Sequence, residues 1–333
     1  MDLYPYTFRP LYKEKIWGGR NLERLFGRPL PAGAKIGESW ELTDLKEGAS
    51  VLANGPDAGA TLTELTGALG EKLLGRARPL TGIAPLPGAR GKPRGAARFP
   101  LLLKLLDAND ILSLQVHPDQ AAANAIGGDA ASKVECWYIL ESRNGFIYLG
   151  LRPGVRPEAF RKAIEANTVE RLIQRIDVKA GEFYYLPAGT VHALGPGVVV
   201  AEVQTPSDTT YRISDWGRGR EIHVERSLEC IRFEPPPPQA PPGADGTLLV
   251  TDFFTVSRRG ARGSAGRALP QGKCAAIMLV AAQGPVEVTH DGPVEKAVVL
   301  HAGDTVLLPA GLSNATLNAA GQCQWLEITL AER

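Results

Sequence analysis

Two histidines, a glutamate and a glutamine stand in strand-like segments whose spacing could assemble a divalent-metal site. In the run from Leu112 to Pro118, apolar and polar residues alternate, and Gln115 and His117 are both among the polar ones. Because side chains on a strand point to opposite faces with a period of two, Gln115 and His117 project from the same face.

Glu135 and His192 complete this candidate set. Glu135 opens the strand-like run 136–140, and His192 ends a third strand-like segment that starts with the run 182–186 and continues through a turn. Three hydrogen-bonded strands would bring the four side chains together. One amide oxygen, one carboxylate and two imidazoles suit Zn²⁺ or a similar divalent ion. The alternative is that these are surface or hydrogen-bonded histidines, as a single histidine in a strand usually is.

Length and composition narrow the class of protein. With 333 residues, the chain is long enough for two or three domains. A net charge of +1 gives no strong field for nucleic acid or a membrane surface. The sequence begins without a signal segment, has no apolar run of membrane-spanning length, and carries four scattered cysteines. We therefore expect a cytoplasmic protein without nucleic-acid or membrane partners, whose oligomeric state the sequence leaves open.

Short apolar runs between Gly, Pro, Asn and Asp predict a mainly β protein built from β-sandwiches. The helical exceptions are Thr61–Leu74 and, more clearly, 157–176, where an apolar stripe follows Pro157. We interpret 157–176 as a small helical insertion that covers one end of a sandwich. The Gly-, Pro- and Arg-rich segment 77–97 is either a phosphate-attracting loop or a solvated mobile one.

A proline-rich segment at 235–242 is typical of a semi-rigid linker. It predicts a metal-binding domain at 1–234 and a second domain at 243–333.

An internal repeat relates these two parts of the chain. Segment 180–189 returns as 302–311, with Ala, Gly, Leu, Pro, Ala and Gly at equivalent positions, which predicts two related β-sandwiches. The second copy has Asn314 in the place of His192 and no counterpart of the Gln-x-His strand. We therefore expect the chemistry in the first domain and a structural role for the second.

Charged residues near the predicted ligands indicate what the site could bind. Lys104 lies inside an apolar run, which is unfavourable unless it reaches a partner or a cleft, although a solvent-facing lysine remains an alternative. Glu202 follows another apolar run. Arg212 could bind an oxyanion, or it could pair with Asp208 or Asp215. A metal, carboxylates and two cations suit a phosphorylated or carboxylated substrate, in which a base moves a proton between carbons.

Seven segments, in order along the chain, resemble the type I mannose-6-phosphate isomerases in their short bacterial form. The resemblance implies a fold of two cupin-like (jelly-roll) domains with one zinc ion per chain. It also implies the interconversion of D-mannose 6-phosphate and D-fructose 6-phosphate through a cis-enediol, a step of carbohydrate metabolism. The segments are Ile16–Arg20, Gly37–Leu42, Leu103–Ala108, Gln115–Asp119, Glu135–Tyr138, Pro187–Leu194 and Asp208–Arg212.

The resemblance also assigns roles to particular residues. It leaves the catalytic base unidentified, and two alternatives stay open: an isomerase of an unphosphorylated sugar, or a non-enzymatic sugar-binding cupin. The implied set is His117, Glu135 and His192 as metal ligands with Gln115 as the fourth, Arg212 as a catalytic residue, and Lys104 and Glu202 as substrate-binding residues.

Overall fold

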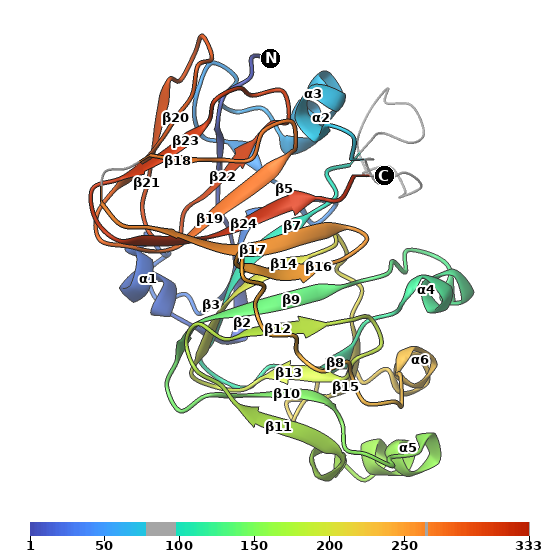
Figure 1. The fold of residues 1–333 in the computed structure, drawn as a ribbon. Helices are drawn as coiled ribbons and strands as arrows, with labels where there is room; N and C mark the ends of the chain where they lie inside the picture. Colours follow the sequence, from blue (N-terminus) through green and yellow to red (C-terminus); the bar gives the residue numbers. More distant parts are fainter. Residues whose placement is uncertain (78–97, 264–265, 333) are drawn as a thin grey trace.

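The structure, a computed structural model, describes residues 1–77, 98–263 and 266–332. It is mainly β and confirms the expected fold class, two cupin-like β-sandwiches with a few short helices (Figure 1). The segment at 77–97, whose role the sequence left open, lies outside the described residues except for Ala77. Within the described ranges, no helix combines the length and the apolar character needed to cross a membrane.

The first sandwich packs a six-stranded sheet against a five-stranded one. Buried side chains from both sheets, among them Leu106, Trp137, Leu149 and Leu194, fill the space between them. In sheet order, the six strands are β12 (Phe183–Leu186), β9 (Glu135–Ser142), β14 (Val198–Gln204), β7 (Leu102–Ala108), β3 (Ile36–Leu42) and β2 (Leu11–Gly19), and the five are β11 (Ile173–Asp177), β10 (Phe146–Leu151), β13 (His192–Leu194), β8 (Leu114–Val116) and β15 (Tyr211–Ser214).

The second sandwich packs a seven-stranded sheet against a four-stranded one, around buried residues such as Ile277, Leu279, Val288 and Leu317. The two-stranded pair β4 (Asp44–Leu45) and β5 (Gly48–Ala49) is separate. In sheet order, the seven strands are β16 (Thr247–Val250), β17 (Phe254–Ala261), β24 (Cys323–Leu330), β19 (Ala275–Ala282), β22 (Thr305–Leu308), β1 (Tyr6–Arg9) and β6 (Val51–Leu52), and the four are β18 (Arg267–Ala268), β23 (Thr316–Ala319), β20 (Val286–Thr289) and β21 (Ala297–Leu300).

The sheets cross the domain boundary that the linker predicts. Strand β1 pairs with β22, and β6 pairs with β1, so two early strands belong to the sheet of the second sandwich. A division into 1–234 and 243–333 thus separates most strands but not all, and it stays a proposal. The linker itself is tied down, because the side chain of Gln239 bonds both the N–H and the C=O of Tyr185 on the edge strand β12.

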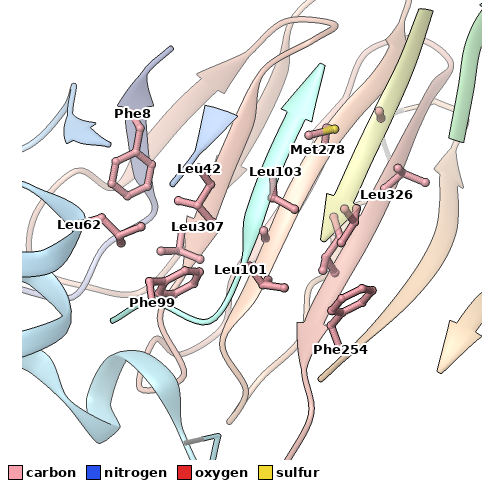
Figure 2. Close-up of a cluster of buried hydrophobic side chains, with 14 of the residues drawn as sticks. Phe8, Leu42, Leu62, Phe99, Leu101, Leu103, Phe254, Met278, Leu307 and Leu326 are labelled. Atoms are coloured by element: carbon pink, nitrogen blue, oxygen red, sulfur yellow. The ribbon is translucent and has the colours of Figure 1, made fainter. Parts of the chain in front are cut away.

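A shared core joins the two sandwiches (Figure 2). Leu103 of β7 lies in one buried cluster with Met278 of β19 and Leu326 of β24. The six-stranded and seven-stranded sheets therefore pack face to face. Each such buried side chain contributes roughly 1.5–3 kcal/mol through the removal of apolar surface from water.

The helices are short and lie outside the sheets. Phe160 and Ile164 of α5 are buried against the outer face of the five-stranded sheet, and α4, α5 and α6 gather at this end of the first sandwich (Figure 1). The described helices are α1 (Asn21–Phe26), α2 (Leu62–Leu69), α3 (Glu71–Leu74), α4 (Gln120–Ile126), α5 (Pro157–Glu165) and α6 (Val224–Cys230), with a 3₁₀ turn at Val169–Leu172.

The helix predicted over 157–176 is wrong in its second half. Helix α5 ends at Glu165, and Asn167 has a φ of 53°, the left-handed conformation that commonly ends a helix. The apolar residues that extended the predicted stripe belong instead to the 3₁₀ turn and to β11, which pairs with β10. Asparagine adopts the left-handed conformation more readily than most residues, so Asn167 indicates in the sequence where the helix ends.

Candidate metal centre and the adjoining cavity

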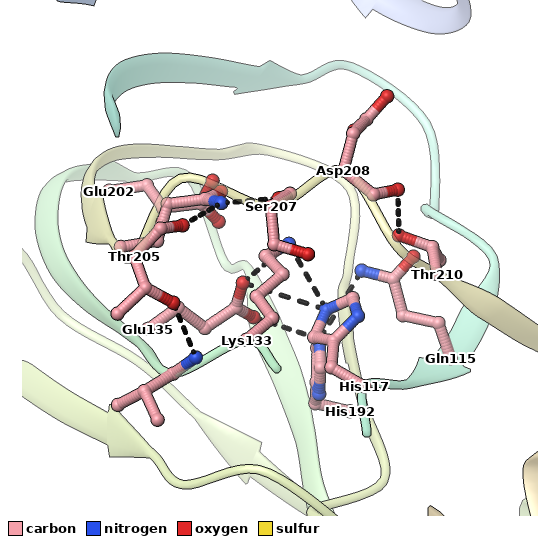
Figure 3. Close-up of polar contacts among 12 residues, drawn as sticks. Gln115, His117, Lys133, Glu135, His192, Glu202, Thr205, Ser207, Asp208 and Thr210 are labelled. Carbon is pink, nitrogen blue, oxygen red and sulfur yellow. Dashed lines mark hydrogen bonds and ion pairs between the residues drawn. The ribbon is translucent and has the colours of Figure 1, made fainter. Parts of the chain in front are cut away.

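The four predicted ligands converge between the two sheets of the first sandwich (Figure 3). Gln115 on β8 and His192 on β13 are register partners in the five-stranded sheet, and His117 directly follows β8. Glu135 is the first residue of β9, in the opposing six-stranded sheet. The expected arrangement on three hydrogen-bonded strands is therefore wrong, because the turn after β12 carries the chain across to the other sheet before His192.

Three of these side chains are close enough to share one ion. The Nε2 atom of His192 lies 2.9 Å from Oε1 of Glu135, and Nε2 of His117 lies 3.6 Å from Oε2 of the same carboxylate. One ligand atom from each residue lies within 4.8 Å of the other two. All three are buried, so the alternative of surface histidines is excluded by their position.

Main-chain carbonyl groups orient both histidines. Nδ1 of His117 lies 2.8 Å from the carbonyl oxygen of Thr209, and Nδ1 of His192 lies 2.8 Å from that of Thr190. A carbonyl oxygen only accepts, so each Nδ1 carries the proton and each Nε2 presents a lone pair. Burial and the nearby Lys133 also lower the pKa of His117 to about 3, which keeps its imidazole neutral.

The centre therefore turns acceptor atoms of His192 and Glu135 toward one another. Nε2 of His192 and Oε1 of Glu135 face one another at 2.9 Å, and Oε1 accepts no hydrogen bond from the described residues. Two lone pairs at this distance are compatible when a positive ion lies between them. This donor set, two neutral imidazoles and one carboxylate, fits a divalent ion such as zinc.

Lys133 is a neighbour of the centre that the sequence reasoning missed. Its ammonium lies 2.8 Å from Oε2 of Glu135 and 3.2 Å from Nε2 of His117. Burial raises the pKa of Glu135, but the ammonium of Lys133 outweighs it and holds that pKa well below its ordinary value. The sequence could have indicated this neighbour, because Lys133 stands two positions before Glu135 and side chains two positions apart on an extended chain share a face.

Gln115 contacts the centre through its amide. Its Nε2 atom lies 3.2 Å from Nε2 of His192. An amide presents its oxygen in the same direction after a half-turn about its last bond, and the two orientations have nearly the same shape. Gln115 as a fourth ligand stays a proposal that needs this half-turn.

A cavity of about 270 Å³ adjoins the centre, and Lys104 and Glu202 contribute to its wall. Lys104 is 4% exposed, so the alternative of a solvent-facing lysine is wrong. Its ammonium lies 3.2 Å from Glu202 and 3.6 Å from Glu38. Burial lowers the pKa of Lys104, but the two carboxylates outweigh it and raise that pKa, so the lysine stays charged. Trp137 donates to the second oxygen of Glu202 at 2.9 Å.

Arg212 lines the same cavity from β15. It is the register partner of Gln115, so His192, Gln115 and Arg212 form one row across three neighbouring strands. Its Nη1 donates to the carbonyl oxygen of Glu221 at 2.7 Å, and its buried Nε has no hydrogen-bond partner among the described residues. Asp215, which the sequence offered as a partner, instead binds other arginines.

Two further residues of this cavity escaped the sequence reasoning. Glu38 accepts from Trp40 at 2.6 Å and pairs with Lys15 at 2.9 Å, and Arg220 is held against Asp215 at 2.5 Å. Glu38 lies within a segment that resembles the family, whereas no motif around Arg220 indicates that it belongs to the site.

Comparisons with known proteins agree with this geometry. Residues 6–138 match the family model described as phosphomannose isomerase type I, catalytic domain. The mannose-6-phosphate isomerase ManA of Bacillus subtilis is 34% identical to this chain over 97% of this chain and 98% of that protein.

Solved structures are similar over nearly the whole chain. The crystal structure of a mannose 6-phosphate isomerase from Bacillus subtilis has a TM-score of 0.79 at 30% identity, and covers 97% of this chain and 99% of that one. A mannose 6-phosphate isomerase structure bound with zinc and yttrium shares the fold, with a TM-score of 0.72 at 17% identity over 98% of this chain and 99% of that one.

Proposed function

Because the chain belongs to the type I phosphomannose isomerases, we propose that it interconverts D-mannose 6-phosphate and D-fructose 6-phosphate with one zinc ion per chain. The observation that carries this proposal is the buried convergence of His117, Glu135 and His192 beside a cavity lined by cations. We also propose that the enzyme works in the cytoplasm, in keeping with four cysteines that are all buried and unpaired.

His117, Glu135 and His192 would hold the ion, with the amide oxygen of Gln115 as the fourth ligand. A bound divalent ion polarises a sugar carbonyl and holds neighbouring oxygens on the same side. The main-chain carbonyl groups of Thr190 and Thr209 fix the tautomers of His192 and His117, so each Nε2 lone pair is available to the ion.

The reaction moves two protons. From aldose to ketose, the proton on C2 moves to C1, and the hydroxyl proton on O2 is lost as O1 gains one, through a cis-enediol. Negative charge develops on oxygen when the C2 proton leaves. Arg212 stays charged at any working pH and can stabilise that charge, while Lys104, kept cationic by two buried carboxylates, can donate hydrogen bonds to sugar oxygens.

Two guanidinium groups in the cavity wall suit a phosphate. Arg212 and Arg220 both line this cavity. The carboxylate of Asp215 holds Arg220 in place, because it accepts from the main-chain N–H of Arg220 and also binds the Arg220 guanidinium. Guanidinium groups bind phosphate oxygens with paired hydrogen bonds. This pair favours a phosphorylated sugar over the unphosphorylated alternative.

A coupled isomerase assay on the purified chain tests the proposal. We expect turnover of mannose 6-phosphate, little turnover of mannose, loss of activity with a zinc chelator, and recovery when zinc is restored. Equal turnover of mannose would favour an isomerase of unphosphorylated sugars. Sugar binding without any turnover by the zinc-loaded protein would leave only a sugar-binding cupin.

A further inference from the structure

A second cavity, of about 850 Å³, lies in the second sandwich. Strands β16, β17, β18 and β24 contribute its wall, which includes Ser257, Arg259, Arg267 and Glu327. The metal centre and its adjoining cavity belong to the other sandwich, so this cavity is separate from the site already described.

Strand pairing relates the two cavities through the internal repeat. Tyr184 and Val306 hold the same position in the repeated segment, on β12 and β22. Tyr184 pairs with Trp137 of β9, and Val306 pairs with Ile277 of β19. Strands β9 and β19 are therefore equivalent, and so are Trp137 and Ile277.

The equivalence continues across the next strands. On their other side, these two residues pair with Glu202 of β14 and Glu327 of β24, respectively. One strand further, Glu202 pairs with Lys104, and Glu327 pairs with Ser257. The second cavity therefore occupies the place of the proposed substrate cavity, with Glu327 where the first sandwich has Glu202.

The metal centre has no counterpart at the equivalent positions. Leu186 pairs with Glu135 in the first sandwich, and Leu308, its equivalent in the repeat, pairs with Ala275. Asn314, which matches His192 in the repeat, is exposed. At these described positions the second sandwich has no counterpart of the proposed ligands Glu135 and His192, although it keeps a cavity.

Charged and polar groups of the second cavity suit an organic phosphate. Four cationic residues, Arg258, Arg259, Arg267 and Lys273, line the cavity and outnumber the carboxylates of Asp245 and Glu327. The side chain of Arg258 donates to the carbonyl oxygen of Gly181, so a phosphate would meet the other three. Nε of Arg259 lies 3.3 Å from Oε1 of Glu327, which holds that guanidinium in place. Hydroxyl groups on β16, β17 and β24 add donors and acceptors for a polar ligand body.

Trp325 supplies an independent observation. This residue lines the cavity and is 2% exposed, and its indole N–H is buried without an acceptor among the described residues. An unpaired buried donor is costly, so native structures rarely keep one that nothing occupies. A hydroxyl or phosphate oxygen in the cavity would satisfy it.

We propose that the second sandwich binds a phosphorylated sugar in this cavity without converting it. The choice of ligand rests on the proposed function, because the cavity is the repeat-related counterpart of the one that receives the substrate. The cationic wall selects the phosphate, and the hydroxyl groups with the indole N–H select the sugar.

The indole N–H signals of the ¹⁵N-labelled full-length enzyme report on both sites at once. The chain has five tryptophans, and Trp325→Phe identifies the signal of Trp325. We expect a saturable shift of this signal on titration with fructose 6-phosphate, and at least about tenfold weaker responses to fructose and to inorganic phosphate. The signal of Trp137, in the first sandwich, follows binding at the isomerase site.

A double variant, Arg267→Ala with Lys273→Ala, tests the location. Both side chains are exposed, so the fold should persist, and the Trp325 response should weaken by about tenfold or more while isomerase activity is retained. Lys296→Ala, an exposed change elsewhere in this sandwich, should alter neither. A silent Trp325 signal, an unchanged response in the double variant, or equal binding of fructose would overturn the proposal. Absence of isomerase activity in the wild-type protein would refute the proposed function instead, because the Trp325 signal responds to binding and does not require turnover.

Discussion

At the level of single residues, the candidate metal centre depends on main-chain acceptors. The carbonyl groups of Thr190 and Thr209 turn the Nε2 lone pairs of His192 and His117 toward Glu135. Because these partners are backbone atoms, substitution of a neighbouring side chain leaves the tautomers unchanged. The ligands themselves are the residues whose loss should be felt.

His192→Ala should remove most of the bound metal and nearly all isomerase activity. It deletes one of two imidazoles from a buried set of three groups, and a single lost ligand weakens zinc sites strongly. Metal analysis by mass spectrometry of the purified wild type should give about one ion per chain. His301→Ala, at an exposed histidine of the second sandwich, is the matched control and should keep full metal content. Full occupancy in the His192 variant would remove this residue from the ligand set.

Arg212→Ala should lower kcat and kcat/KM together by about 10²–10³, the usual effect of losing a group that stabilises developing charge. Steady-state kinetics with mannose 6-phosphate measures this. Arg226→Ala, at an exposed arginine of α6, should have no effect. A higher KM with unchanged kcat would mean that Arg212 only anchors the ground state, and normal values of both would exclude it from the site.

At the level of secondary-structure elements, three neighbouring strands hold one buried charge network. Lys104 on β7 and Glu202 on β14 are register partners, and Glu38 lies diagonally across on β3. Strand register thus places a cation between two carboxylates in a buried position, where the low dielectric strengthens the interaction. Loss of Glu38 leaves the buried Lys104 with Glu202 as its remaining carboxylate partner, which destabilises the fold.

Glu38→Gln should destabilise the fold in a pH-dependent way. Burial opposes ionisation of Glu38, but Lys104 and Lys15 outweigh it and lower its pKa from 4.5 to about 2. The ionised carboxylate therefore stabilises the fold fully above pH 4.5, and this contribution is lost as the pH falls toward 2.

Urea unfolding of the wild type and the Glu38→Gln variant across this pH range measures the effect. The difference in free energy of unfolding should be largest near neutral pH and should shrink as the solution becomes acidic. A difference that stays constant with pH would show that the ionisation of Glu38 contributes nothing to stability.

For the whole molecule, the core between the six-stranded and seven-stranded sheets couples the two sandwiches. Leu326 of β24 is fully buried there beside side chains of the first sandwich. The early strands β1 and β6 in the seven-stranded sheet add a second connection. We therefore expect the two sandwiches to unfold together.

Leu326→Ala should lower the free energy of unfolding by about 2–5 kcal/mol, because it leaves a cavity in this core. Tryptophan fluorescence and isomerase activity, followed through the same urea transition, should move together to lower urea. Val250→Ala removes an apolar side chain that is 69% exposed and should change little. If activity kept its wild-type midpoint while fluorescence showed a separate early transition, the two sandwiches would be independent.

The sequence determined the features that depend on local pattern. Alternation put Gln115 and His117 on one face, and both lie at the candidate metal centre (Figure 3). Recurrence of the repeated segment predicted two related sandwiches, and Gly181 and Gly303 have the same φ of 89° at equivalent positions. The mainly β fold followed from short apolar runs separated by turn residues.

Tertiary structure decided what depends on contacts between distant segments. Glu135 meets the histidines from the opposing sheet, Lys133 reaches the carboxylate, and Arg212 joins the row of Gln115 through strand register. The repeat alone does not show whether the second sandwich has a cavity. The folded chain forms one beside Glu327, and strand pairing shows that Glu327 is equivalent to Glu202. A strand pattern specifies which side chains share a face, but the partner of that face is chosen by the packing of the whole chain, so no local pattern contains it.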